Sequence, residues 1–462
     1  MTKLEVEQTK QNERIFGIFD FIWLWFGMTA QMGVFTLGAS FAFRISFWSA
    51  VAAIFIGNFV VSIVLVLNGD PGSKYGVKFA VFLRAPFGYF GCKLPALVRA
   101  IGATCWFVIQ TWFAAIAINL AVRYFINYYT GAVSDFDHSI LFFVLFGALE
   151  IFLTLNGVKW IKWLQNLAAP ALLALSFFII WKLISAAPGG WNEFANAAID
   201  ERRALPFGMA LTANLSYWVT VAINISDFTR NVKNHPGEKY WKRNKVNIIG
   251  QMPAITIGMI VFIMVGMVGG VFTGNGNPVE IIHSSLGGPW VLLGLFIILL
   301  AQISTNVPAN LFATSNVLSS VFREYGLTYP KAVILAGCVG MLTFPWFIIE
   351  NFMTYLPIIG AFLAPLPGIM ITDYYIIRKT KLSVTNLFDF GGKYRYWHGV
   401  NPAAIIAYAL GVAVGWIFLR YSWLAALPVA VVVYYVLMKV WVEKAYPASC
   451  TEDPNEPVIV NQ

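Results

Sequence analysis

A tryptophan and a glutamine inside one apolar segment have the spacing of a ligand site. Trp106 and Gln110 are four residues apart, so a helix places both side chains on one face. An indole stacks on a flat ring, while a carboxamide donates and accepts hydrogen bonds at the edge of that ring. The pair therefore favours binding of a planar ligand with amide edges. The alternative is a structural tryptophan beside an interhelical hydrogen bond, which is common in membrane bundles.

A second polar group lies within residues 301–310. Ala301, Ser304 and Thr305 share a helix face, because they are three and four residues apart. One carbonyl and two hydroxyls are oxygen ligands of the kind that a small alkali cation accepts, and a broken helix nearby would add further carbonyls. The alternative is that both hydroxyls bond back to their own helix beside Pro308. The density of polar residues favours the cation site.

Four further residues in apolar segments have more than one interpretation. Gln31 and Trp218, with Tyr217 beside it, are each explained as well by helix packing as by ligand binding. Glu150 is a carboxylic acid inside an apolar segment, where charge is expensive and often functional. We expect Glu150 to be either a protonatable coupling group or the partner of a neighbouring polar side chain.

Composition and motifs exclude several classes of protein. The 462 residues are 59% hydrophobic and 11% charged, whereas soluble domains carry about a quarter charged residues. The net charge of +9 does not indicate nucleic-acid binding, because the basic residues lie between apolar segments, where membrane topology explains them. The four histidines form no metal motif, and no catalytic acid, nucleophile or metal set appears. We expect a membrane protein that is not an enzyme and needs no cofactor.

Twelve apolar segments approach the ~20 residues that a helix needs to cross a bilayer. These spans lie near residues 18–42, 46–68, 94–124, 139–156, 161–185, 206–226, 248–272, 289–318, 331–348, 352–375, 401–419 and 423–441. The connections after even-numbered spans are rich in lysine and arginine, and most others are poor in them. Because cytoplasmic loops collect these residues, the alternation predicts an even number of spans and two cytoplasmic termini.

Several spans are interrupted by glycine or polar residues. Span one carries Gly27, Gln31 and Gly33 at mid-depth, and span six carries Asn214 and Asn224. Corresponding breaks in two halves of a chain indicate a transporter whose site lies between inverted repeats. A channel would instead need a continuous polar stripe or a charged ring. At the ends of spans six and ten we expect ordinary ion pairs, Asp227 with Arg230 and Asp373 with Arg378.

Six segments carry a resemblance to a known family. They are WFGMTAQ (25–31), KYGVKFAVFLRAPFG (74–88), WFVIQTW (106–112), NISDFTR (224–230), STNVPAN (304–310) and PGIMITDYY (367–375). Over nearly its whole length the chain resembles the nucleobase–cation symporter family of hydantoin, allantoin, uracil and cytosine permeases. Through Gln31 it is most similar to the bacterial sodium–hydantoin branch, while NISDFTR is more similar to the allantoin and uracil branch.

The resemblance implies an all-α membrane fold of twelve transmembrane helices. It has two inverted five-helix repeats in the leucine-transporter-like arrangement, then two C-terminal helices, and its first and sixth helices are discontinuous. The implied divisions are a cytoplasmic N-terminal segment (1–16), a first repeat (17–185), a second repeat (186–375), a cytoplasmic loop with two further helices (376–441) and a cytoplasmic tail (442–462).

The resemblance also implies the site. A planar heterocycle would stack between Trp106 and Trp218, bond to Gln110 and Asn310, and lie near Gln31. The implied sodium ligands are the carbonyls of Gly27, Ala30 and Ala301 and the hydroxyls of Ser304 and Thr305.

The chain departs from the hydantoin branch at two positions. Tyr217 stands where the hydantoin transporter has glycine, so we include this phenol among the substrate-binding residues, where it narrows or re-polarises the pocket. Glu150 stands where that branch can have glutamine, which leaves proton coupling open. The expected protein is a monomeric, multi-pass importer in the lipid of the inner membrane. It would take up a planar nitrogen heterocycle by sodium symport with alternating access. The alternative is a proton-coupled symporter of a purine, pyrimidine or vitamin-type heterocycle.

Overall fold

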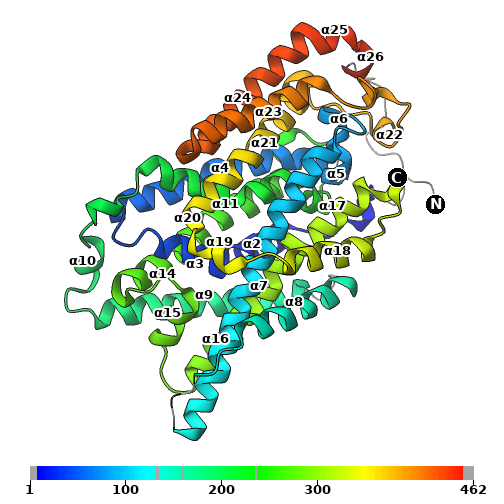
Figure 1. Cartoon of the computed structure of the whole chain (residues 1–462). Coiled ribbons are helices and arrows are strands. Elements are labelled where there is room, and N and C mark those ends of the chain that lie inside the picture. The colour runs from blue at the N-terminus through cyan, green and yellow to red at the C-terminus, as the bar shows by residue number, and fades with distance from the viewer. Residues whose placement is uncertain (1–7, 132, 134, 158–160, 235–236, 451–462) are drawn as a thin grey trace.

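The structure is a computed structural model that describes residues 8–131, 133, 135–157, 161–234 and 237–450. Within these residues the chain is helical, and β-pairing is limited to isolated bridges. Figure 1 shows the long helices running side by side, with the C-terminal pair at one edge of the bundle. The fold is therefore an all-α bundle, as the apolar segments predict.

All twelve predicted spans correspond to helices. Spans one to six are α2 (Ile18–Thr29) with α3 (Met32–Ala39), α4 (Phe47–Tyr75), α7 (Lys93–Thr130), α8 (Ser139–Leu155), α9 (Ile161–Ala186) and α11 (Phe207–Asn224). Spans seven to twelve are η3 (Asn247–Gln251) with α14 (Met252–Thr273), α16 (Trp290–Asn306) with η4 (Val307–Phe312) and α17 (Ala313–Val321), α18 (Tyr329–Met341), α20 (Phe352–Leu363) with α21 (Pro365–Ile371) and η6 (Thr372–Ile377), α23 (Pro402–Ile417), and α24 (Ser422–Leu437) with η9 (Met438–Val442).

Short helices occupy the connections. They are η1 (Gln11–Glu13), α5 (Phe79–Phe82), α6 (Arg84–Phe87), α10 (Gly190–Ala195), η2 (Glu201–Arg203), α12 (Ser226–Thr229), α13 (Tyr240–Arg243), α15 (Pro278–Ser285), η5 (Arg323–Tyr325), α19 (Pro345–Glu350), α22 (Val384–Leu387), η7 (Lys393–Arg395), η8 (Leu419–Tyr421), α25 (Glu443–Ala445) and α26 (Pro447–Cys450).

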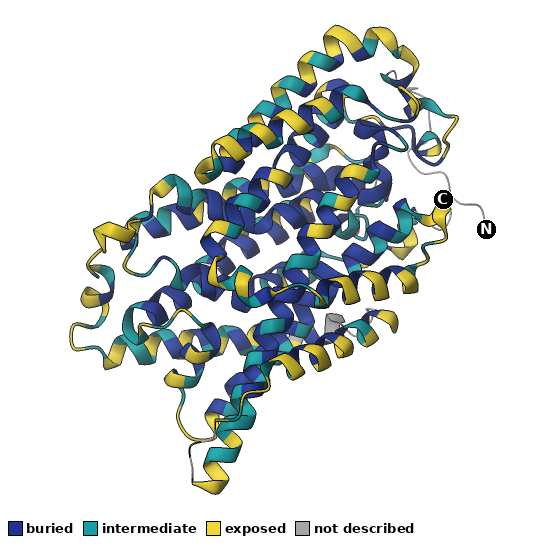
Figure 2. Cartoon of the chain, in the orientation of Figure 1, coloured by how far each residue is buried: buried dark blue, intermediate teal, exposed yellow. Residues whose placement is uncertain are grey.

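The helices differ in length and in apolar composition, the two properties that decide whether a helix can cross a bilayer. Among the described residues, seven continuous helices are long and apolar enough to cross it, and the bent pair α2–α3 makes an eighth. The helices α8, α18 and α23 are apolar but shorter. The remaining span, α11, is more polar because it buries Asn214, Ser216, Thr220 and Asn224. Figure 2 shows exposed residues along the outer helices. Many exposed residues are large and apolar, as expected of a surface that faces lipid.

Breaks occur where the local sequence disfavours a continuous helix. Span one breaks at Ala30 and Gln31, which leave helical geometry, and its two halves meet at a 53° bend. In span six the helix ends at Asn224 and resumes at Ser226, at the end of the span. Span nine is shorter than predicted: α18 ends at Met341, and Phe344 leaves helical geometry because Pro345 follows it.

Span eight contains a π-helical stretch in its middle. The element η4 includes Pro308, which lacks a backbone N–H and so cannot complete an α-helical ladder. Single π-turns inside α-helices are frequent at functional sites. Here the irregular turn carries Asn310 to the centre of the bundle, where α7 packs against both α16 and η4.

Both described ends of the chain lie on one side of the bundle (Figure 1). Near the N-terminus, Phe16 pairs with Val232, and Arg14 donates to the Ser73 carbonyl at 2.7 Å. Near the C-terminus, the Ser449 carbonyl accepts from Arg378 at 3.2 Å. Ser73 lies in the last turn of span two, and Val232 and Arg378 directly follow spans six and ten, so the helix count is even.

Buried ion pairs stabilise the same side. Arg378 and Asp373 are 2.7 Å apart and fully buried, which confirms the ion pair predicted at the end of span ten. Asp227 accepts from the backbone N–H of Phe79 at 2.8 Å and caps α5, and its pairing with Arg230 stays a prediction. Sequence reasoning missed Asp70, which lies inside α4 and pairs with Arg243 at 2.8 Å.

Candidate functional site

All six predicted substrate-binding residues line one cavity at the centre of the bundle. The cavity is lined by Met28, Gln31, Trp106, Gln110, Tyr217, Trp218, Thr220, Val221, Thr305, Ala309 and Asn310. Its wall therefore comes from the break in span one, from α7 and α11, and from the end of α16 with η4. The free space is about 20 Å³, little more than one water molecule needs. The walls are nearly in contact, so a heterocycle enters only if they separate.

Three aromatic rings form one wall. Tyr217 lies 4.7 Å from Trp106 and 5.8 Å from Trp218, measured between ring centroids. The phenol therefore contacts both indoles that the family resemblance places on either side of a ligand. Gly33 makes room for it, since a Cβ at that position would lie 2.8 Å from the Tyr217 hydroxyl. Any ligand stacked on Trp106 has to share space with the Tyr217 ring or displace it.

The two carboxamides opposite the rings are held in defined orientations. The Gln110 side-chain oxygen accepts from the Thr305 hydroxyl at 2.9 Å. The Asn310 side-chain nitrogen donates to the Asn306 oxygen at 2.8 Å. A carboxamide has two N–H donors and one carbonyl oxygen, so Gln110 keeps its N–H groups for a ligand, while Asn310 keeps its carbonyl oxygen and one N–H. The Gln110 donor and the Asn310 acceptor come from neighbouring helices.

Several polar atoms that line the cavity lack a hydrogen-bond partner among the described residues. They are the Gln31 side-chain oxygen, the indole nitrogens of Trp106 and Trp218, and the hydroxyls of Tyr217 and Thr220. Most buried polar atoms in proteins are hydrogen-bonded, because an unpaired one costs about 1–3 kcal/mol. Five such groups around one cavity could be satisfied by a polar ligand.

The residues predicted to hold sodium lie beside this cavity on two packed elements, α2 and α16. The Ala301 carbonyl accepts from the hydroxyls of Ser304 and Thr305, each at 2.9 Å. The Gly27 carbonyl accepts from Ala30 N–H at 3.1 Å where span one breaks. These hydrogen bonds within one helix are those of the structural alternative. A hydroxyl can also rotate to present its lone pairs to a cation, so the sodium site stays a prediction.

Gln302 joins the broken helix to the rest of the site, and sequence reasoning gave it no role. Its side-chain oxygen accepts from Met32 N–H at 3.4 Å, just after the break in span one. Its side-chain nitrogen donates to the Gln110 backbone carbonyl at 2.9 Å. A single fully buried carboxamide thereby connects α3, α16 and α7.

Glu150 has polar partners, as one of the two expectations for it required. One carboxylate oxygen accepts from the Asn306 side chain at 2.9 Å, and the other accepts from the Thr111 hydroxyl at 2.6 Å. All three residues are fully buried between α7, α8 and α16. Each partner directly follows a residue that lines the cavity, namely Thr305 or Gln110.

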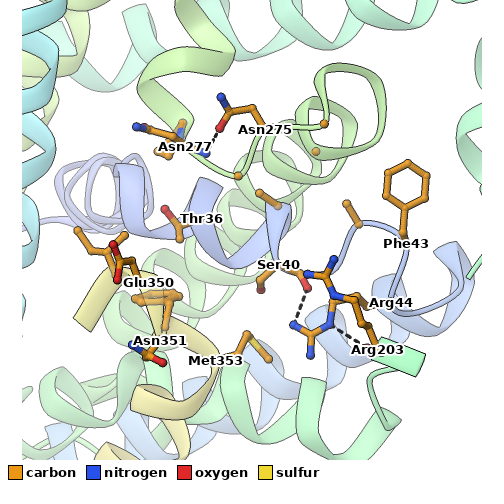
Figure 3. Close-up of a pocket in the computed structure, with 18 of the residues that line it drawn as sticks. Thr36, Ser40, Phe43, Arg44, Arg203, Asn275, Asn277, Glu350, Asn351 and Met353 are labelled. Carbon is orange, nitrogen blue, oxygen red and sulfur yellow. Dashed lines mark hydrogen bonds between the residues drawn. The ribbon is translucent and has the colours of Figure 1, made fainter. Parts of the chain in front are cut away.

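A larger cavity of about 600 Å³ lies between α3, the first residues of α20 and the connection from α14 to α15 (Figure 3). Its lining residues include Thr36, Ser40, Arg44, Arg203, Asn275, Asn277, Glu350, Phe352 and Met353. Many belong to connections after odd-numbered spans, so it opens on the side opposite the termini. Phe352 also packs 5.9 Å from Trp106, as does Tyr355. Phe352 thus lines the larger cavity and also contacts Trp106, which lines the central one.

Sequence reasoning missed some residues of the central region. Met28, Thr220, Val221 and Ala309 line the cavity without a distinctive pattern. Arg99 had a clear signal, because it is a charge inside an apolar span. It is fully buried and donates to the Ala309 carbonyl at 3.1 Å, where η4 departs from α-helical geometry.

Comparisons with known proteins agree with this fold. A family model described as permease for cytosine/purines, uracil, thiamine, allantoin matches residues 8–441. A hydantoin permease from Microbacterium maritypicum is 29% identical, with 97% of this chain and 91% of that protein covered. An allantoin permease from Bacillus subtilis is 27% identical, with 93% and 91% covered. A nucleobase–cation–symport-1 family transporter, solved in a closed conformation with bromovinylhydantoin bound, superposes with a TM-score of 0.85 at 28% identity over 97% of both chains.

Proposed function

The chain belongs to the family of permeases for cytosine and purines, uracil, thiamine and allantoin, and on this premise we propose that it imports a planar nitrogen heterocycle by sodium symport. The family consists of membrane transporters, so the chain is a multi-pass permease and not an enzyme. The substrate class that we propose is hydantoin, allantoin, uracil or a related nucleobase, and transport proceeds by alternating access.

The observation that carries this proposal is the unpaired polar rim of the central cavity. A flat heterocycle with amide edges stacks on an indole and satisfies hydrogen-bonding groups around its edge. The Trp106 ring offers the stacking face, and Gln110 and Asn310 offer a donor and an acceptor. The unpaired oxygen of Gln31 adds a further acceptor. Trp218 and Tyr217 complete the rim that we assign to the substrate.

Sodium coupling follows from one shared residue. The Thr305 hydroxyl has a single hydrogen and two acceptors at 2.9 Å, the Ala301 carbonyl and the Gln110 side chain. Sodium held by the Ala301 carbonyl and the Thr305 oxygen would exclude the first of these hydrogen bonds. The hydrogen then goes to Gln110 and fixes its N–H toward the ligand. The ion thus favours the binding-competent orientation, and such differential affinity is what coupling requires. Ser304, Gly27 and Ala30 complete the proposed ion site.

Alternating access involves α20. The larger cavity leads from the side opposite the termini to the ring of Phe352, which contacts Trp106. We assign that side to the cell exterior and both termini to the cytoplasm of the inner membrane. Movement of α20 away from α7 would admit a heterocycle, and its return would cover it. The two inverted repeats proposed at residues 17–185 and 186–375 would then exchange which side is open. One polypeptide contains every proposed site residue, so a monomer suffices.

A proton-coupled symporter is the second candidate. Glu150 is a fully buried carboxylic acid one side chain removed from the substrate amides, which is where a coupling proton would act. Its hydrogen bonds to Asn306 and Thr111 are compatible with a permanently ionised or a protonated group. Sodium remains the first proposal because the hydroxyl and carbonyl oxygens lie directly beside Gln110.

Quenching of tryptophan fluorescence tests the binding site in the purified protein. Hydantoin, allantoin and uracil are titrated in the presence of sodium, and the same titrations are repeated with Trp106→Ala and Gln110→Ala. We expect saturable quenching that both substitutions abolish. Trp416 on α23 is exposed and distant in sequence from the site, so Trp416→Phe is the matched control. Unchanged quenching in Trp106→Ala and Gln110→Ala contradicts the proposed site.

A further inference from the structure

A chain of buried hydrogen bonds runs from Glu150 to the edge of the central cavity. The Glu150 carboxylate accepts from the Asn306 side-chain nitrogen at 2.9 Å. The Asn306 oxygen in turn accepts from the Asn310 nitrogen at 2.8 Å. Glu150 and Asn306 are fully buried, while Asn310 lines the cavity. Glu150, which does not line the cavity, is therefore connected through Asn306 to Asn310, a proposed ligand contact.

The orientation of the Asn306 amide is determined by its neighbours. Its nitrogen lies 3.0 Å from the Phe107 backbone carbonyl and 2.9 Å from the Glu150 carboxylate. The Phe107 carbonyl can only accept a hydrogen bond, and so can the ionised form of Glu150, so together they require the two N–H hydrogens of Asn306. The oxygen of Asn306 must then face Asn310. A reversed amide would place oxygen against oxygen at two fully buried contacts.

The orientation of the Asn306 amide determines the orientation of the Asn310 amide, which is the proposed ligand contact. Because Asn306 presents an oxygen, Asn310 turns its nitrogen toward it and offers its own carbonyl oxygen to the cavity. On the facing helix, the side-chain oxygen of Gln110 accepts from the Thr305 hydroxyl, so the side-chain nitrogen of Gln110 is available to the cavity. With sodium bound, Gln110 therefore offers a donor to the cavity, and Asn310 offers an acceptor.

We propose that Glu150 and Asn306 are positioning residues that make the cavity selective for a lactam edge over an amidine edge. A lactam edge places a ring carbonyl next to a ring N–H, which match the Gln110 donor and the Asn310 acceptor. An amidine edge places an amino group next to an unprotonated ring nitrogen, which reverses both partners. The inference rests on the proposed function, since it presumes that a heterocycle occupies this cavity.

The discrimination expected is large because both mismatches occur in a desolvated site. Leaving buried hydrogen-bonding groups unpaired or opposed weakens binding by roughly 10- to 100-fold. Two pairs of near-isosteric ligands measure it: 1-methylhydantoin against creatinine, and 1-methyluracil against 1-methylcytosine. Within each pair the N1 methyl group is common, and only the lactam or amidine edge differs.

Binding to the purified protein is measured for each pair with sodium present. We expect the wild type to prefer the lactam member by roughly 10- to 100-fold. Glu150→Gln should keep that preference, because its amide oxygen still accepts from Asn306 and its nitrogen can donate to Thr111. Glu150→Leu should narrow it, and Asn306→Ala should reduce it to about threefold or less, because the released Asn310 amide can rotate.

Thr154→Val is the matched control on the same helix. The Thr154 hydroxyl donates to the Glu150 backbone carbonyl at 2.6 Å, within α8, so its loss should leave the ligand preference unchanged. A wild-type preference for the amidine members would overturn the proposal. So would a preference that survives in Asn306→Ala, because a purely structural role for Asn306 alters overall affinity and leaves the ratio unchanged.

A second measurement needs no ligand. Melting temperatures of Glu150→Leu, Asn306→Ala and the double variant form a cycle that reports the interaction between the two side chains. We expect the double variant to lose less than the sum of the single losses, because each single substitution leaves its partner buried and unpaired. Additive losses would overturn the hydrogen-bond chain. If no heterocycle binds the wild type, the proposed function fails, and this cycle still tests the chain.

Discussion

The Thr305 hydroxyl lies 2.9 Å from the side-chain oxygen of Gln110, so one hydrogen bond joins the proposed ion site to the proposed substrate site. Thr305 belongs to α16 and Gln110 to α7, and the two helices pack along their length. A ligand that fixes the direction of this hydroxyl also fixes the orientation of the amide. Coupling between ion and substrate therefore needs no long-range movement at its first step.

Removing the Thr305 hydroxyl should uncouple the two ligands. In Thr305→Val we expect heterocycle affinity to become independent of sodium and to equal roughly the sodium-free affinity of the wild type. The loss relative to the sodium-bound wild type should be about 1–3 kcal/mol, which is a typical coupling free energy between two ligands. Titrating the heterocycle at several sodium concentrations measures this. Thr305→Ser keeps the hydroxyl and should keep the dependence. An equally steep sodium dependence in the valine variant would contradict the shared-residue account.

Stacking on Trp106 should contribute strongly to affinity. Trp106→Ala removes the ring that packs against Tyr217, and we expect binding to weaken by about tenfold or more, as aromatic contacts add roughly 0.5–1.5 kcal/mol beyond burial. Trp106→Phe retains a smaller ring and should lose less. Isothermal calorimetry provides the comparison. Equal losses in the two variants would argue that the indole acts through its nitrogen instead of its face.

Tyr217 should limit the size of the ligand. Its ring contacts both Trp106 and Trp218 in a cavity with little free space. Tyr217→Gly should therefore admit heterocycles with bulky 5-substituents that the wild type rejects. Tyr217→Phe, which removes only the unpaired hydroxyl, should leave the size limit in place. Competition assays with a graded series of 5-substituted hydantoins test this, and an unchanged size limit in the glycine variant would refute it.

The buried Asp373–Arg378 pair should be essential for stability. Arg378→Ala leaves a buried carboxylate without its cation, and breaking such a pair costs about 3–5 kcal/mol. A large drop in melting temperature in detergent is expected. Lys439→Ala provides the control, because Lys439 pairs with Glu443 at the surface, where a salt bridge contributes at most about 1 kcal/mol. Similar drops in both variants would show that burial does not govern this pair.

Features that depend on neighbouring residues in the chain could be predicted from the sequence. Trp106 and Gln110 share a face because α7 is uninterrupted, and the break in span one lies at Gln31, where polar and glycine residues interrupt the apolar run. Pro345 also indicates that a helix ends shortly before it, but we predicted a continuous span over residues 331–348, and that prediction was wrong.

Contacts between distant segments could not be predicted in the same way. Glu150 and Asn306 are 156 residues apart, and neither residue type reveals the other as its partner. The α4 helix continues to Tyr75 through Pro71, beyond the predicted end at residue 68, because Asp70 is buried against Arg243 from a distant connection. Tertiary packing decides such cases, and the apolar pattern within one segment carries no information about it.

Uptake by purified protein in proteoliposomes tests sodium-coupled heterocycle transport most directly. Labelled hydantoin, allantoin and uracil are offered with an inward sodium gradient, with equal sodium on both sides, and with a proton gradient alone. The account predicts that at least one heterocycle accumulates only with the sodium gradient, and that a protonophore does not prevent it. Uptake that ignores sodium and collapses with the protonophore would contradict it.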